Sequence, residues 1–389
     1  MHAPLLRVQA LTGAGLACKP SAQRHVECTQ VADDGLKRLG IPAGLARLVA
    51  EEGQRIGSRM YLLDNSGSTS AGDGSTFQAI GRGRVARRPC TRWEEISAFA
   101  EDHARWNLRL GTPCVFVLLN SKRRVPGSPI VVGRDCVCME KSNGSEEEQL
   151  HELRDMLKGN GPCGVTPISE RLEEIRSVIQ AGVSGLAQRA QMVSLILVTD
   201  GLPTPWFSGE STLADKNHMV DMMRSLCASL PVLLVIRLFT QDAETVNFYN
   251  SIRERLAVSW DILDNLECEA QELAKRGDGW FAYTPVIHRM REAGTCAIGL
   301  NAEDGRPLSP AQVRRLAGLL SGSRRSLDHL SDRDFINEMT RIVAAAPLVY
   351  DVRRRQRRPI LDVMRLRAAL KVGFRGVVLP GICACFRSV

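Results

Sequence analysis

The sequence predicts an α/β protein with a doubly wound, mainly parallel sheet, helices on both faces of that sheet, and a helical C-terminal extension. Two observations lead to this prediction. Short apolar runs without polar alternation are typical of strands that are buried on both faces of a parallel sheet. These runs are separated by segments with helical periodicity, and that alternation is the order of β-α units. A chain of 389 residues is long enough for one large core with extensions.

The N-terminal part is predicted to be a disordered leader over residues 1–33 and a helical lead-in over residues 34–54. The leader contains basic residues but no acidic residue before Glu27. Because this composition also suits an organellar transit peptide, that alternative stays open. In the lead-in, Leu45 and Val49 have the spacing of one helix face.

The α/β domain is predicted over residues 56–263. Its expected strands are Met60–Leu63, Val115–Leu119, Ile130–Val132, Val193–Thr199, Val232–Leu238 and Val258–Leu263. Its expected helices are 91–108, 141–159, 168–179, 212–229 and 243–257. Thr91 and Glu94 have the spacing of a capping box, so the first of these helices is expected to begin there. The Gly- and Arg-rich residues 70–90 are interpreted as a long insertion.

Two further segments follow the α/β domain. Residues 264–345 are predicted to be a mostly helical extension that packs on the domain, with Ser309 and Pro310 at the start of one helix. Residues 346–389 are first Arg-rich and then apolar, and we interpret them as a tail.

The composition is that of a soluble globular protein, with 44% hydrophobic and 24% charged residues. No apolar run is long enough for a transmembrane segment. The 12 cysteines lack the spacing of zinc sites, which favours reduced thiols in an intracellular protein, cytoplasmic or nuclear. The net charge of +8 favours acidic partners. Four basic residues of the predicted insertion contribute to it: Arg82, Arg84, Arg87 and Arg88.

Oxygen-bearing side chains follow two of the predicted strands. Asp64, Ser66 and Ser68 come after the first strand in the order D-x-S-x-S, and Asp200 follows the strand that ends at Thr199. Between them, Thr166 adds a hydroxyl on a turn. Carboxylate and hydroxyl oxygens are the ligands of hard cations, so the sequence predicts a site for Mg²⁺, with Ca²⁺ or Mn²⁺ as alternatives.

At these residues the sequence resembles the von Willebrand factor A-type (VWFA) domain. The metal-ion-dependent adhesion site of that family consists of D-x-S-x-S, then a Thr, then an Asp after a later strand. The resemblance assigns these roles to Asp64, Ser66, Ser68, Thr166 and Asp200, and none departs from the pattern. Because few protein carboxylates touch such an ion, we expect a partner's exposed Asp or Glu to fill its open position. Intracellular relatives of this fold serve as adaptors, so the resemblance implies a protein-interaction module. A looser likeness to uncharacterised protist proteins with such a domain lies around residues 90–95 and 248–250.

Two other functions are alternatives. A metal with two aspartates can activate water, but a hydrolase also needs a positioned base or nucleophile, and no His lies in the three metal loops. We therefore expect a protein that is not an enzyme. The second alternative is binding of nucleic acid through an Arg-rich patch, which can also act as a targeting signal. The patch consists of Arg353, Arg354, Arg355, Arg357 and Arg358.

Overall fold

The computed structural model describes residues 43–79, 85–121, 131–255, 260–295, 307–323 and 329–372, together with residues 300 and 327. A six-stranded sheet forms its centre, in the order β5-β4-β1-β6-β7-β8. Neighbouring strands are parallel, except that β5 is antiparallel to β4. The strands are β1 Ile56–Leu63, β4 Cys114–Leu118, β5 Cys136–Met139, β6 Met192–Thr199, β7 Val232–Leu238 and β8 Trp260–Leu263.

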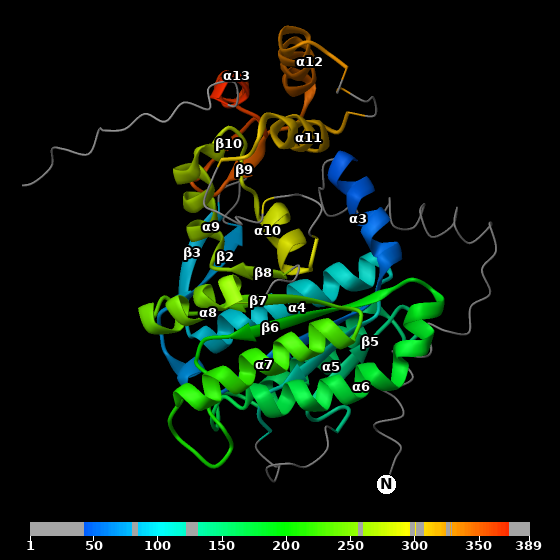
Figure 1. Cartoon of the computed structure of the whole chain (residues 1–389), viewed down its shortest axis with the longest axis vertical. Coiled ribbons are helices and arrows are strands. Elements are labelled where there is room, and N and C mark those ends of the chain that lie inside the picture. Colours follow the sequence, from blue (N-terminus) through cyan, green and yellow to red (C-terminus); the bar gives the residue numbers. More distant parts are fainter. Residues whose placement is uncertain are drawn as a thin grey trace, which may run out of the picture.

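Helices cover both faces of this sheet (Figure 1). Alternate residues of β1 enter two separate apolar clusters because successive side chains of a strand point to opposite faces. Met60 and Leu62 pack with residues of α6, α7 and α8, whereas Tyr61 and Leu63 pack with residues of α4 and α5. The prediction of an α/β fold with a mainly parallel sheet covered on both faces is thus confirmed. These helices are α4 Arg92–Leu110, α5 Glu146–Gly159, α6 Ile168–Gln188, α7 Leu213–Ser229 and α8 Ala243–Arg255.

Two segments differ from the prediction. The edge strand β5 begins at Cys136, whereas the strand expected at 130–132 shows only one bridge, from Val132 to Cys136, within its described residues. The Cys136 side chain is buried and acts as a small apolar residue of a strand. The expected insertion at 70–90 contains a hairpin of β2 Gly74–Ala79 and β3 Val85–Cys90. The Gly- and Arg-rich composition of this segment gives no strand signal. Contacts between β2 and α4 help to hold the hairpin in place.

The C-terminal extension forms a third apolar cluster, above the sheet in Figure 1. Helix α3, Ala43–Arg55, belongs to this cluster although it precedes the sheet in the sequence. It approaches α11 closely, since a Cβ at Gly44 would lie 2.1 Å from the carbonyl oxygen of Leu319. The other elements are α9 Leu266–Leu273, the π-helical turn η2 Ala274–Asp278, α10 Pro285–Glu292, α11 Pro310–Ser321, α12 Asp332–Ala345, β9 Val349–Asp351, β10 Gln356–Arg358 and α13 Val363–Val372.

Buried ion pairs join this extension to the sheet. Arg237 on β7 donates a hydrogen bond to Glu292 on α10 at 2.7 Å. His103 and His288 lie 3.2 and 3.0 Å from the same carboxylate, and these three neighbours keep the pKa of Glu292 well below its ordinary value. Removing one partner of such a buried pair is strongly destabilising. The extension is therefore held on the sheet by specific contacts, as well as by its apolar cluster.

Candidate metal centre

The predicted ligands lie at the carboxyl edge of two neighbouring strands. Numbered along the chain, the strands of the sheet have the order 3-2-1-4-5-6, which reverses between β1 and β6. In doubly wound sheets this reversal opens a crevice where ligands bind. Asp64 follows β1 and Asp200 follows β6, and the Asp64 amide donates to the Val198 carbonyl at 2.9 Å. The two aspartates therefore flank the crevice of the sheet.

Three of the five side chains form a continuous hydrogen-bonded row. The hydroxyl oxygens of Ser66 and Ser68 are 3.0 Å apart, and the Ser68 hydroxyl donates to Asp200 Oδ1 at 2.8 Å. Ser68 lies on the short 3-10 turn η1, Gly67–Ser70, which places it on the surface. Ser66 and Asp200, at the two ends of the row, are buried, so the row meets the solvent at its middle member, Ser68.

Asp64 is fully buried at the inner end of the site. Its Oδ1 accepts a hydrogen bond from the Ser66 amide at 2.8 Å, and its Oδ2 accepts one from the Thr199 hydroxyl at 2.7 Å. Both bonds fix the orientation of the carboxylate. Thr199, the last residue of β6, was missed in the sequence because it reads there as an ordinary strand residue.

Thr166 is brought to the same place by its neighbours. A Cβ at Gly201 would lie 3.5 Å from the Thr166 hydroxyl and 3.9 Å from the Ser68 hydroxyl, so Gly201 lies between the two side chains. The Thr166 carbonyl accepts a hydrogen bond from the Thr204 amide at 2.9 Å. The Gly67 amide in turn donates to the Gly164 carbonyl at 3.0 Å. The three loops that carry the five predicted residues are thus tied together.

Two asparagines, which were also missed in the sequence, support these loops. The Asn65 side chain donates to the carbonyls of Asn120 and Asn160, and its Oδ1 accepts from the Asn120 amide at 2.8 Å. Asn120 donates to the Val165 carbonyl at 2.7 Å. Gly164 has φ +73°, and a Cβ there would lie 2.9 Å from Asn120 Oδ1, so both its backbone and its neighbour require glycine.

The electrostatics of the site favour a cation. Burial, together with the neighbouring charge of Asp200, raises the pKa of Asp64 to about 6. Burial also raises the pKa of Asp200, although hydrogen bonds from Arg92 and Ser68 oppose this effect. Two carboxylates that resist ionisation in each other's presence are stabilised when a positive charge lies between them.

Arg92 already supplies one positive charge. Its Nη1 donates to Asp200 Oδ2 at 3.0 Å, while its Nε and Nη2 donate to Asp73 at 2.7 and 2.6 Å. Arg92 is the first residue of α4, and nothing in its sequence position relates it to Asp200. Of the four arginines of the predicted insertion, neither of the two that the structure describes is shown to contact the candidate site as Arg92 does. Arg87 lies 3.9 Å from Glu267 of the extension, and Arg88 is exposed. Arg82 and Arg84 lie outside the described residues.

Among the described residues, no three or more His, Cys, Asp and Glu side chains form a group that could hold a metal ion. The candidate centre has a different composition, because it contains two carboxylates and three hydroxyls.

The Arg-rich patch is divided among different environments. Arg358 is buried, pairs with Asp351, and donates to the Phe281 carbonyl at 2.9 Å. Arg355 at the turn of the β9–β10 hairpin donates to Glu267 at 3.2 Å. Residues 349–372 thus fold against the extension, which differs from the expected tail. Residues 373–389 lie outside the described part.

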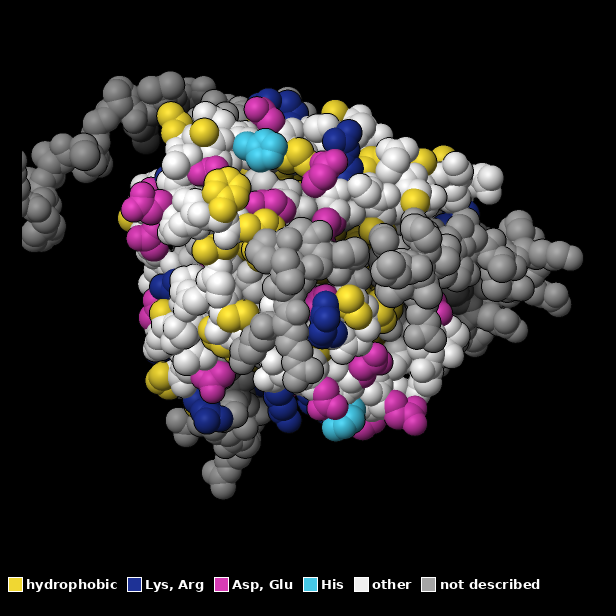
Figure 2. All heavy atoms as spheres, turned by 90° about the horizontal axis from the view of Figure 1, so that it is seen from below, with side chains coloured by type: hydrophobic (Ala, Val, Ile, Leu, Met, Phe, Trp, Pro, Cys, Tyr) yellow, Lys and Arg dark blue, Asp and Glu magenta, His cyan; other side chains and the backbone are white. Residues whose placement is uncertain are grey.

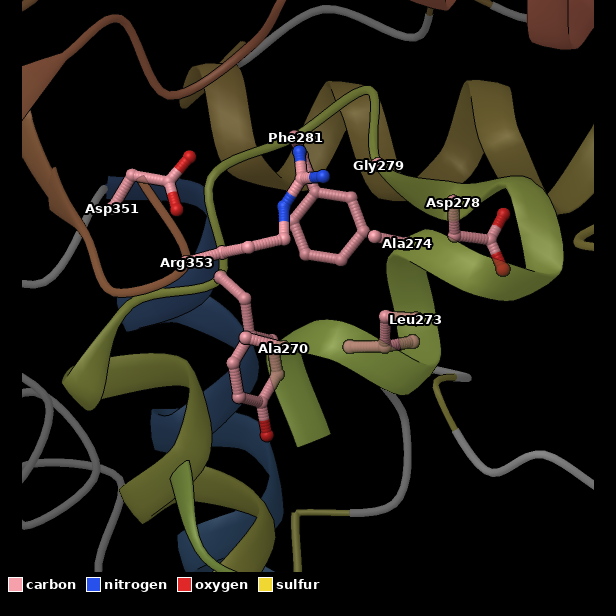
Figure 3. A pocket seen from close by; sticks show the side chains of 9 residues that line it. Ala270, Leu273, Ala274, Asp278, Gly279, Phe281, Asp351 and Arg353 are labelled. Atoms are coloured by element: carbon pink, nitrogen blue, oxygen red, sulfur yellow. The ribbon is translucent and has the colours of Figure 1, made fainter. Parts of the chain in front are cut away.

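Arg353 lines a small cavity beside this hairpin. Figure 3 shows its side chain next to the ring of Phe281, with Asp351 and Asp278 on opposite sides. The cavity has a volume of about 10 Å³, which is the space of a single water molecule. Burial lowers the pKa of Arg353. The patch is therefore not one continuous exposed row of arginines.

Comparison with known proteins gives no family for this chain: no protein-family model matches it, and no curated protein matches it. Among the helices that the structure describes, none is both long and apolar enough to cross a membrane.

Proposed function

We propose that this chain is a VWFA-type protein that holds a divalent cation, Mg²⁺ in the first place, and uses it to bind an acidic group of a partner protein. The observation that carries the proposal is that the three loops which bear the five oxygen side chains meet at the crevice of the sheet, where Ser66, Ser68 and Asp200 are hydrogen-bonded in a row. The five side chains are Asp64, Ser66, Ser68, Thr166 and Asp200. Ca²⁺ and Mn²⁺, which accept the same oxygen ligands, are alternatives.

The balance of charge supports an anionic partner. Asp64 and Asp200 contribute two negative charges, which a divalent cation would balance, and Arg92, shared between Asp200 and Asp73, adds a positive group at the rim. A cation that its protein ligands do not over-neutralise favours a further anionic oxygen. Ser68, the exposed ligand, marks the side from which a partner's Asp or Glu would approach.

The same contacts favour binding over catalysis. The two oxygens of Asp64 accept hydrogen bonds from the Ser66 amide and Thr199, and those of Asp200 accept from Ser68 and Arg92. These partners orient the carboxylates, and none of them is a general base. A hydrolase would need a base that is aimed at a water molecule. We therefore propose a binding protein and test the alternative by assaying phosphate, ester and peptide hydrolysis in Mg²⁺.

The direct test is a calorimetric titration with Mg²⁺ and Mn²⁺, combined with thermal unfolding. Wild type is expected to bind saturably and to gain thermal stability, because a ligand of the folded state alone stabilises it. Asp64→Ala and Ser68→Ala are expected to lose both effects. Ser70→Ala is the matched control, since Ser70 lies in the same turn and its hydroxyl donates to the Gly67 carbonyl. Equal binding by wild type and Asp64→Ala would overturn the proposal.

A further inference from the structure

A groove lies beside the candidate metal centre. It is formed by the first turn of α6, the loop between β6 and α7, and the beginning of α7, and its volume is about 230 Å³. We call it the loop groove. The residues that carry the following argument are Glu170, Pro203, Pro205, Phe207 and Asp215, and His218 also lines the groove. The loop groove is linked to the metal centre, because the backbone amide of Thr204 in the groove donates a hydrogen bond to the carbonyl of Thr166.

The loop that lines the groove is fixed but presents an exposed aromatic ring. The Trp206 amide donates to Glu170 at 3.3 Å, and the Trp206 ring lies under the guanidinium of Arg171 at 5.4 Å. The next residue, Phe207, is 91% exposed. The ring offers a large, rigid apolar surface beside the groove, which a partner can cover. Because the loop is already ordered, a partner would lose little conformational freedom on binding there.

The charges of the groove select its occupant. Glu170 and Asp215 line it together with the two prolines and Phe207. Each carboxylate accepts hydrogen bonds within the chain, Glu170 from the Trp206 amide and Asp215 from Thr212. Neither is paired with a cation by these bonds, so a purely apolar occupant would remove two negative charges from water without neutralising them, which is costly. Lys and Arg side chains combine an apolar stem with a cationic head, so the stem suits the prolines and the head suits the carboxylates. The Phe207 ring adds a cation–π contact. Figure 2 shows hydrophobic, acidic and histidine side chains next to one another on one face of the molecule.

We propose that the loop groove binds a Lys or Arg side chain of the same partner segment whose Asp or Glu reaches the metal centre. This inference rests on the proposed function, and it adds the chemistry of the partner: a segment of protein that carries both an acidic and a basic residue. The metal centre would select the carboxylate, and the loop groove would select the cation.

The experiment is a selection of binding peptides from a phage-displayed library of random heptapeptides, with the purified chain as the target and Mg²⁺ present. Enrichment of peptides with both an acidic and a basic residue is expected. The double variant Glu170→Gln, Asp215→Asn should still enrich acidic residues but no longer basic ones. Both substitutions keep an oxygen acceptor for the bonds that these side chains make to Trp206 and Thr212, so folding should be retained. Selection in EDTA should lose the acidic residues.

A synthetic copy of a selected peptide then gives the size of the effect. Its affinity, measured by fluorescence polarisation, should fall at least about tenfold in Phe207→Ala, because the Lys or Arg side chain of the peptide loses its contact with the aromatic ring. Leu213→Ala is the matched control, since Leu213 is 74% exposed near the same loop but does not line the groove. That variant should bind like wild type.

The outcomes separate the two proposals. If acidic residues alone are enriched, in wild type as in the double variant, the proposal for the loop groove is wrong and the proposal for the metal centre is supported. Enrichment of basic residues alone supports the loop groove and contradicts the metal-dependent function. Enrichment of neither class, or equal loss of affinity in Phe207→Ala and Leu213→Ala, overturns the inference.

Discussion

Arg92 Nη1 donates to Asp200 Oδ2 at 3.0 Å, so a fixed cation shares a carboxylate with the proposed metal ion. The rest of the guanidinium is held by Asp73, which keeps the positive charge at the rim of the site. The charge of Arg92 has two opposite effects. It repels a divalent cation, and it attracts the anionic group that completes the coordination.

Replacing Arg92 should therefore strengthen metal binding and weaken partner binding. Arg92→Gln is expected to bind Mn²⁺ roughly tenfold more tightly by calorimetry, because about 1.4 kcal/mol of repulsion is removed. Its affinity for an acidic peptide should fall. Arg105→Gln is the control, since Arg105 lies on the same helix but pairs with Glu101 and Asp102. Unchanged metal affinity in Arg92→Gln would contradict this account.

Thr199 should act as a positioning residue for Asp64. Its hydroxyl donates to Asp64 Oδ2 at 2.7 Å, and hydrogen bonds to metal-binding groups commonly contribute about 10- to 100-fold in affinity. Thr199→Val keeps the shape of the side chain and is expected to weaken Mn²⁺ binding by that factor. Thr199→Ser restores the hydroxyl and should restore affinity. If Val and Ser variants bind equally, the hydroxyl has no such role.

The stabilising effect of the metal should depend on pH. In the metal-free folded state the pKa of Asp64 is raised from 3.8 to about 6. The folded state therefore holds this proton more tightly than the unfolded state. The resulting stabilisation is complete below the unfolded pKa and is lost as the pH rises through about 6. Metal binding requires the carboxylate, so added Mg²⁺ competes with this proton.

Thermal unfolding at two pH values checks this expectation. The increase in melting temperature on adding Mg²⁺ should be large at about pH 7.5 and small at about pH 5. Asp64→Asn, which does not titrate, should show little Mg²⁺ effect at either pH. An equal increase at both pH values in wild type would show that Asp64 does not control metal binding.

The sequence predicted the parts of the fold that depend on local signals. The capping box at Thr91 and Glu94 is present, and Ser309 caps α11 with Pro310 at its first position. The strand at Val232–Leu238 has the predicted bounds. These elements were predictable because caps and continuous apolar runs act within a few residues.

What the sequence did not predict depends on contacts between distant residues. The β2–β3 hairpin is Arg-rich and is stabilised by packing on α4, for example through the bond from the Ser75 amide to Glu95 at 2.8 Å. The ligands of the candidate site could be named from their order along the chain. Arg92 and Asn120 could not, because only the fold brings them to Asp200 and Asn65.

The Arg-rich patch gives the last prediction. Arg358 is buried against Asp351 and the Phe281 carbonyl, whereas Arg357 on the same strand is exposed. Removing one member of a buried ion pair leaves the other charge unpaired, so Arg358→Ala should lower the free energy of unfolding by about 3–5 kcal/mol. Arg357→Ala is the matched control and should change it little. Chemical denaturation measures both.

The same pair of variants tests the alternative function of the patch. A phosphate-binding patch would lose nucleic-acid affinity in Arg357→Ala, and that affinity would fall steeply with salt. We expect no measurable binding of DNA or RNA by wild type at physiological salt, because Arg358 and Arg353 are committed to packing within the extension. Salt-sensitive binding that weakens in Arg357→Ala, together with equal stability of the two variants, would instead assign the patch to nucleic acid.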